Sequence, residues 1–114
     1  MYLTLLKSKI HMARVTSAEV EYIGSIAICP KLLKASGIMV NEKVHVLNFE
    51  NGARFETYVI EGKEQEIGLR GPAARLAKLG DRVIILTYAM FEKKEASSHK
   101  PTVIFVDEKN QVQK

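Results

Sequence analysis

The chain has 114 residues, 46% of them hydrophobic, which indicates one ordinary domain with a core across residues 1–114. Its net charge of +4 is spread along the sequence and its aromatic content is only 7%, so we expect no nucleic-acid partner. No apolar run approaches the roughly 20 residues that a membrane-spanning helix needs, so we expect no membrane association and a cytoplasmic location.

The first half of the sequence predicts short strands separated by turns, and one helix. Residues 30–37 favour the helix, because proline is well placed in a first helical turn and Gly37 ends it. Asn51-Gly52 between two strand-like segments predicts a β-hairpin, since Asn-Gly is the strongest short hairpin signal. The strands expected here span residues 2–6, 9–15, 19–22, 26–28, 44–49 and 54–60, with a turn at 16–18.

The second half predicts further strands and two more short helices. Residues 71–80 open with Gly-Pro, contain helix formers and end on glycine, which indicates a helix. Residues 82–88 carry the apolar run Val83-Ile84-Ile85-Leu86, as expected for a strand buried on both faces. The remaining expectations are a polar turn at 61–65, strands at 66–69 and 102–106, a helix at 90–97 and a loose polar tail from Asp107.

Many short strands with a few small helices predict a mainly β fold, a compact β-barrel with short helical inserts. A small barrel of this length has little room for an enclosed pocket. We therefore expect any active site to lie in a cleft shared between subunits.

The bond between Gly24 and Ser25 is a candidate for self-cleavage. A serine hydroxyl can attack the carbonyl carbon of the preceding residue and convert the amide into an ester, provided that the peptide is held rigidly and distorted. Glycine suits the carbonyl side because it tolerates backbone angles that other residues resist. Elimination would free Gly24 as a new C-terminus and leave dehydroalanine, which hydrolyses to a pyruvoyl group.

Four side chains on two predicted strands would suit a small anionic substrate. Lys9 and His11 share one strand face, and Arg54 and Tyr58 share another. An arginine fork binds a carboxylate in bidentate fashion, a lysine adds a point charge, and a tyrosine can act as a general acid. Thr57 should point to the opposite face from Tyr58, so a role in the same site requires a bulge or a place elsewhere in an assembly.

A plainer interpretation stays open at this point. Gly-Ser usually marks a turn or a bulge, and the charged residues would then be ordinary solvated side chains beside a hairpin.

The single cysteine, Cys29, excludes an intrachain disulfide and fits a partly buried free thiol. The three histidines show no metal-ligand spacing with Cys29 or with one another, so we expect no metal; they are His11, His45 and His99.

Taken together and in order, these segments resemble the pyruvoyl-dependent aspartate 1-decarboxylase family over nearly the whole chain. The resemblance rests on Lys9-Ile10-His11, Val15-Thr16, Tyr22-Ile23-Gly24-Ser25, Asn51-Gly52-Ala53-Arg54-Phe55, Thr57-Tyr58, Gly71, Ala73-Ala74-Arg75 and Gly80-Asp81 before Val83-Ile84-Ile85. It implies a double-psi β-barrel, a homotetramer with sites between neighbouring subunits, and cleavage into residues 1–24 (β chain) and 25–114 (α chain). The pyruvoyl group from Ser25 would be the cofactor, with no metal and no pyridoxal phosphate.

The resemblance also implies an activity and roles for individual residues. L-Aspartate would form a Schiff base with the pyruvoyl group, lose its α-carboxylate as CO₂ and leave as β-alanine for pantothenate biosynthesis. Ser25 and Tyr58 would be catalytic, the latter as proton donor, and Thr57 would assist the cleavage at Gly24. The substrate-binding residues would be Lys9, Arg54, Thr57, Gly71, Pro72 and Ala73, supported by His11, Tyr22 and Arg70.

Two residues depart from the family pattern where substrate is held. Arg70 stands where the family usually has asparagine, and Pro72 where it usually has alanine. Arginine only donates hydrogen bonds and carries a charge, whereas proline lacks an N–H donor. Arg70 can add an anchor for a carboxylate, so a decarboxylase of another acidic amino acid stays open as an alternative. A second alternative is an unprocessed homologue that acts as a binding module for an anionic partner, given the net charge of +4.

Overall fold

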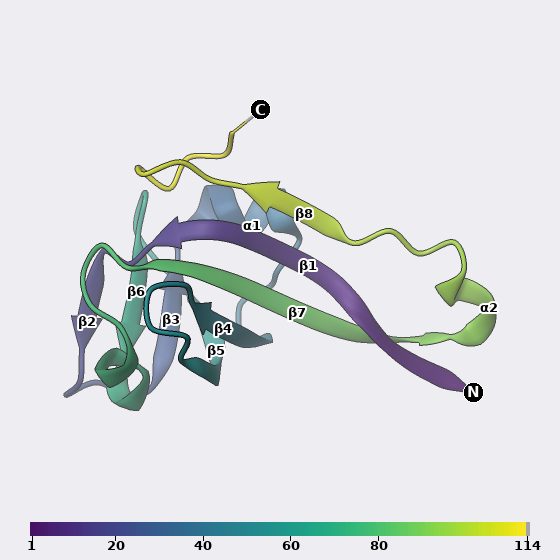
Figure 1. The fold of residues 1–114 in the computed structure, drawn as a ribbon, viewed down its shortest axis with the longest axis horizontal. Coiled ribbons are helices and arrows are strands. Elements are labelled where there is room, and N and C mark those ends of the chain that lie inside the picture. Colours follow the sequence, from purple (N-terminus) through teal and green to yellow (C-terminus); the bar gives the residue numbers. More distant parts are fainter. Residues whose placement is uncertain (114) are drawn as a thin grey trace.

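Eight strands form one open, mixed sheet within residues 1–113, the part of the chain that the computed structural model describes (Figure 1). Their order is β2-β6-β3-β5-β4-β7-β1-β8. The strands are β1 Tyr2–Arg14, β2 Ser17–Glu19, β3 Ser25–Ile28, β4 Lys43–Asn48, β5 Arg54–Glu61, β6 Ile67–Arg70, β7 Arg82–Glu92 and β8 Thr102–Phe105. The helices are α1 Pro30–Ser36, the 3-10 helix η1 Gly71–Leu76 and α2 Lys93–Ala96. The expected mainly β fold with short helical inserts is confirmed.

The sheet combines antiparallel and parallel pairs of strands. The pairs β1–β8, β2–β6 and β3–β5 are parallel, whereas β3–β6, β4–β5, β4–β7 and β1–β7 are antiparallel. In Figure 1, β1 and β7 run together as a long twisted ribbon whose far end carries the N-terminus and α2. None of the helices within these residues has the length and apolar character of a membrane-spanning segment.

Local sequence signals explain α1. Pro30 occupies its first turn, where a missing N–H costs nothing. Gly37 follows its last residue with φ of 76°, and its N–H donates to the carbonyl oxygen of Leu33 at 2.9 Å. This left-handed residue ends the helix as expected from the sequence. The fully buried side chain of Leu32 anchors the helix to the core.

Branched aliphatic side chains from most strands fill the core. All four residues of β3 are buried, and the strand lies between β5 and β6. The largest fully buried side chains are Ile10, Ile26, Ile28, Leu32, Ile67, Leu69, Ile85, Val44, Val46, Val59, Val83 and Asn48. The amide of Asn48 is satisfied, since it donates to the Leu76 carbonyl oxygen at 3.0 Å and to Asp81 Oδ2 at 2.9 Å. Ser25, the first residue of β3, is therefore held in place by a strand that is packed in the core.

Several expected boundaries were wrong, and long-range pairing explains the largest errors. The segments at 2–6 and 9–15 are one strand, because β1 pairs with β7 from Tyr2 opposite Glu92 to Arg14 opposite Arg82. The same pairing extends β7 to Glu92, so the helix expected at 90–97 is confined to α2. A bulge between Ile10 and Ala13 breaks the regular alternation that the sequence suggested.

Smaller corrections concern turns and the tail. The turn expected at 16–18 instead begins β2, and residues 20–22, expected to be extended, form a turn. The helix expected at 71–80 is only the short η1, whose residues pack beside β2 and β6. The tail is not loose: Asn110 is buried, and its amide donates to the carbonyl oxygens of Arg14 and Gln65 at 2.9 and 3.0 Å. Lys114 lies outside the described residues.

Candidate functional site

A small cleft of about 270 Å³ opens beside Ser25. Strands β3, β5 and β6 and the turn before β3 supply its walls. The cleft combines one hydroxyl, two phenols and one guanidinium with two apolar side chains. Its lining residues are Tyr22, Ile23, Ser25, Tyr58, Ile60 and Arg70. The exposed lining is mainly apolar, and the guanidinium gives a small anionic molecule one charged contact.

Ser25 is placed by its neighbouring strands. It is the first residue of β3 and is only 2% exposed, with Arg70 of β6 as its antiparallel partner. On the other side, Ile26 pairs with Val59 of β5, the residue after Tyr58. The Ser25 hydroxyl donates to the carbonyl oxygen of Ile23 at 3.3 Å. The hydroxyl is thus held beside the Gly24–Ser25 bond at the wall of the cleft.

Gly71 packs directly against the backbone of Gly24. Gly71 has φ of 72°, a left-handed conformation, and a Cβ at this position would lie 2.6 Å from Gly24 Cα and 2.8 Å from Gly24 N. It would also lie 2.9 Å from the Tyr22 carbonyl oxygen. Only glycine fits here without displacing the Gly24–Ser25 segment. Pro72 lies on the same side, with Cδ 3.5 Å from where a Gly24 Cβ would be, and Ala73 is buried behind it.

Arg70 brings a positive charge to the cleft. Its Nη2 lies 3.5 Å from Oε2 of Glu66, and its guanidinium carbon lies 5.4 Å from the centre of the Tyr22 ring. Its Nε is buried and has no hydrogen-bond partner within residues 1–113. The guanidinium is therefore oriented by a carboxylate and an aromatic ring while retaining an unused donor.

Strand β5 divides the predicted site residues between its two faces. Arg54 and Tyr58 are on the exposed face and Thr57 is on the other, as the sequence predicts. Tyr58 lines the cleft and is 37% exposed, so its hydroxyl is accessible to a small molecule. Neither Arg54 nor Thr57 lines it. Sharing a strand face is thus not sufficient to place two residues in one cleft.

Lys9 and His11 lie on β1, outside the Ser25 cleft. His11 makes an edge-to-face contact with Phe105, at 5.4 Å between ring centres. Its Nδ1 is buried and lacks a hydrogen-bond partner in the described part of the chain. Burial, followed by the charge of Lys9, lowers the pKa of His11 below its ordinary value. His11 is therefore neutral at pH 7 and remains able to accept a hydrogen bond.

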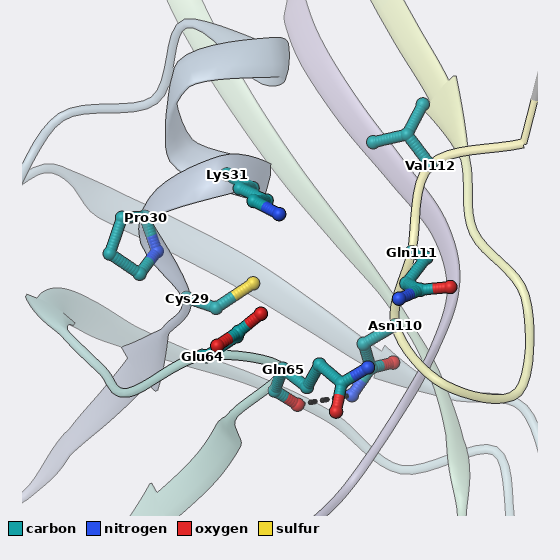
Figure 2. A pocket seen from close by; sticks show the side chains of 8 residues that line it. All are labelled: Cys29, Pro30, Lys31, Glu64, Gln65, Asn110, Gln111 and Val112. Atoms are coloured by element: carbon teal, nitrogen blue, oxygen red, sulfur yellow. Dashed lines mark hydrogen bonds between the residues drawn. The ribbon is translucent and has the colours of Figure 1, made fainter.

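A larger cavity of about 440 Å³ lies at the opposite end of β3 from Ser25 (Figure 2). It contains none of the predicted site residues. Cys29 faces it as a buried free thiol, and the Asn110 amide closes one wall by donating to the Gln65 carbonyl oxygen. Its lining residues are Cys29, Pro30, Lys31, Glu64, Gln65, Asn110, Gln111 and Val112. No group of metal-ligating side chains is found here or elsewhere in residues 1–113.

The structure therefore brings together part of the predicted constellation. Tyr22, Ser25, Tyr58 and Arg70 meet in one cleft, and Gly24 and Gly71 meet beside it. The sequence analysis gave no site role to Ile23, Ile60 or Glu66. The two isoleucines look like ordinary apolar residues, and only the pairing of β3 with β5 and β6 brings them to Ser25. The opposite charges of Glu66 and Arg70, four residues apart, offered a weak signal for their contact.

Comparison with known proteins yields matches over nearly the whole chain. A family model described as aspartate decarboxylase matches residues 1–113. An aspartate 1-decarboxylase of Campylobacter jejuni is 60% identical over 111 residues, which cover 96% of this chain and 88% of that protein. Those of Bdellovibrio bacteriovorus and Carboxydothermus hydrogenoformans are each 54% identical, over 98% and 100% of this chain and 90% and 91% of their own lengths.

Proposed function

The chain belongs to the aspartate decarboxylase family, and from this membership we propose that it converts L-aspartate to β-alanine and CO₂ for pantothenate biosynthesis. It is a decarboxylase, a carboxy-lyase. The observation that carries the proposed reaction is the cleft in which Ser25, Tyr58 and Arg70 meet. At about 270 Å³ the cleft has room for a small amino acid, and its guanidinium can pair with a carboxylate.

The proposal includes self-cleavage between Gly24 and Ser25, giving chains 1–24 and 25–114. The Ser25 oxygen attacks the Gly24 carbonyl carbon, and the C–N bond breaks as an ester forms. Elimination then releases the Gly24 carboxylate and leaves dehydroalanine, to which water adds with loss of ammonia. Two features support this step: the Ser25 hydroxyl is held next to the bond, and Gly71 confines the backbone of Gly24.

A pyruvoyl group at residue 25 fits the residues that surround it. The unused Nε donor of Arg70 and the close backbone cradle made by Gly71 favour a small, oxygen-rich group without a bulky neighbour. When formed, the ketone would bind the substrate amine and accept the electron pair left by CO₂. The chain's own residues supply placement: the Tyr22 ring lies 5.4 Å from the Arg70 guanidinium carbon, and Tyr58 lines the same cleft as Ser25.

Tyr58 is the proposed proton donor. Its phenol lines the same cleft as Ser25 and would hold the proton that replaces the lost carboxylate at the substrate α-carbon.

Lys9, Arg54 and Thr57 do not line this cleft, so the proposal assigns their roles in substrate binding and cleavage to a neighbouring subunit of a homotetramer. His11, neutral at pH 7, would be a supporting hydrogen-bond acceptor there. The proposal keeps the cytoplasmic location expected from the sequence.

The direct test combines a denatured mass spectrum with an assay for β-alanine. We expect two fragments divided between Gly24 and Ser25, the larger carrying a pyruvoyl mass that borohydride reduction shifts. We further expect the cleaved protein to release β-alanine from aspartate faster than it releases CO₂ from glutamate. A fully cleaved protein that prefers glutamate would replace the aspartate assignment with that of another acidic amino acid.

Replacing Tyr58 with phenylalanine should separate cleavage from turnover. The Y58F chain should still divide after Gly24, whereas kcat should fall by about 10²–10⁴-fold, the usual contribution of a general acid. Steady-state release of β-alanine measures the effect, after a mass spectrum confirms equal cleavage. Tyr88→Phe is the matched control, because Tyr88 is also exposed on a strand but does not line the cleft. Normal turnover by Y58F would remove Tyr58 from the mechanism.

A further inference from the structure

We propose that Arg70 binds the side-chain carboxylate of the substrate, the one that is retained, and thereby selects acidic amino acids. This inference rests on the proposed function, because it names the group that Arg70 recognises in the same cleft. It also gives a role to one of the two residues at which this chain departs from its family's pattern.

Position is the first support. Arg70 is the last residue of β6 and the antiparallel partner of Ser25 in β3. Its side chain therefore starts from the strand next to the reacting residue. It contributes the one cationic side chain among the cleft residues within this chain, and no acidic side chain lines the cleft. Within this chain, an anion that enters therefore meets one guanidinium, while the Glu66 carboxylate lies 3.5 Å from Arg70 Nη2 and does not line the cleft.

The Arg70 guanidinium has a neighbouring carboxylate, but not all of its N–H donors have hydrogen-bond partners. The distance of 3.5 Å from Nη2 to Glu66 Oε2 exceeds the about 2.7–2.9 Å of a charge-assisted hydrogen bond. Nε is buried without a partner in the described residues, and a buried donor without a partner is costly. The Tyr22 ring lies beside the guanidinium, with its centre 5.4 Å from the guanidinium carbon. A carboxylate that accepts from Nε and a neighbouring N–H would satisfy the donor in the bidentate geometry that arginine favours.

The course of the reaction decides which carboxylate is bound. A cation that grips the departing α-carboxylate stabilises the ground state and loses its partner as CO₂ forms, so it opposes the chemical step. A cation on the retained carboxylate keeps its partner through the transition state and positions the substrate. Arg70 is therefore assigned to the retained carboxylate, and its loss should raise KM more than it lowers kcat.

Succinate and its neutral diamide, succinamide, test this contact without any reaction, because neither carries an amine that can form a Schiff base. Calorimetric titration of the purified full-length protein should show succinate binding about tenfold more tightly than succinamide, since hydrogen bonds to charged groups are strong. A double variant, Arg70→Met with Glu66→Gln, removes the guanidinium without leaving the Glu66 carboxylate unpaired. Its preference for succinate should fall to roughly one- to twofold. Arg70→Lys, a point charge without the fork, should be intermediate.

Arg75→Met is the matched control, because Arg75 is an exposed arginine of η1 that does not line the cleft. It should keep the wild-type preference for succinate. The inference is overturned if the wild type shows no such preference, if the double variant retains it, or if R75M loses it equally. A cleaved wild-type protein that makes no β-alanine would instead overturn the proposed function, while the succinate preference would still report on Arg70.

Discussion

Replacing Ser25 with alanine is expected to abolish both cleavage and decarboxylation. The variant should remain a single chain of about 12.8 kDa with no carbonyl that borohydride can reduce. The reason is chemical: alanine has no oxygen to attack the Gly24 carbonyl carbon, and an unassisted amide is stable. Alanine removes one atom from a buried site and one hydrogen bond of 3.3 Å, so the fold should persist. A denatured mass spectrum and the β-alanine assay measure the two losses.

Ser97→Ala is the control for this variant. Ser97 is an exposed serine next to α2, and its loss should leave cleavage and turnover at wild-type levels. Circular dichroism of both variants establishes that the fold is intact. Cleavage of the S25A chain after Gly24 would contradict the proposed self-processing, because another nucleophile would then be responsible.

Replacing Gly71 with alanine is expected to prevent cleavage by displacing the bond that must be cut. A Cβ there would lie 2.6 Å from Gly24 Cα, closer than real Cβ atoms come, and the atoms it meets are backbone. Gly71 also has φ of 72°, so alanine adds backbone strain of about 1–2 kcal/mol. The Gly24 backbone must move, and the Ser25 hydroxyl then loses its alignment. The cleaved fraction, followed over time by mass spectrometry, should drop to near zero.

Gly37→Ala separates the steric effect from the strain. Gly37 has φ of 76°, but nothing lies within 4 Å of its Cβ position. This variant should lose about 1–2 kcal/mol of unfolding free energy and cleave at the normal rate. Thermal or chemical unfolding of both variants checks the common strain. If G71A and G37A cleave equally well, the contact between Gly71 and Gly24 has no part in processing.

Local chemistry made some elements predictable. Pro30 and Gly37 bound α1 because both residues restrict or permit particular backbone angles regardless of what lies around them. Asn51-Gly52 likewise indicated the antiparallel pair of β4 and β5, and Gly52 has φ of 75°. Each of these signals depends only on a few residues that are adjacent in the chain. The structure that it produces can therefore be predicted from the local sequence.

Long-range pairing decided the elements that the sequence missed. Residues 90–92 contain helix-compatible residues, yet they are extended because β1 offers backbone partners, such as Thr4 opposite Met90. The tail from Asp107 is ordered because the Asn110 side chain bonds to distant backbone groups of Arg14 and Gln65. These partners are far apart in the chain, and local propensity does not report them.

The sequence by itself contained the chemical groups of the candidate site, a hydroxyl after a glycine at Gly24-Ser25 and a phenol at Tyr58, and the family to which their order belongs. Only the tertiary structure decided which groups meet. The antiparallel pairing of β3 with β6 sets Arg70 across from Ser25, and the left-handed Gly71 then presses on Gly24. The physical reason is that a strand period fixes which face a side chain takes, whereas the neighbour it finds there depends on how distant strands pair.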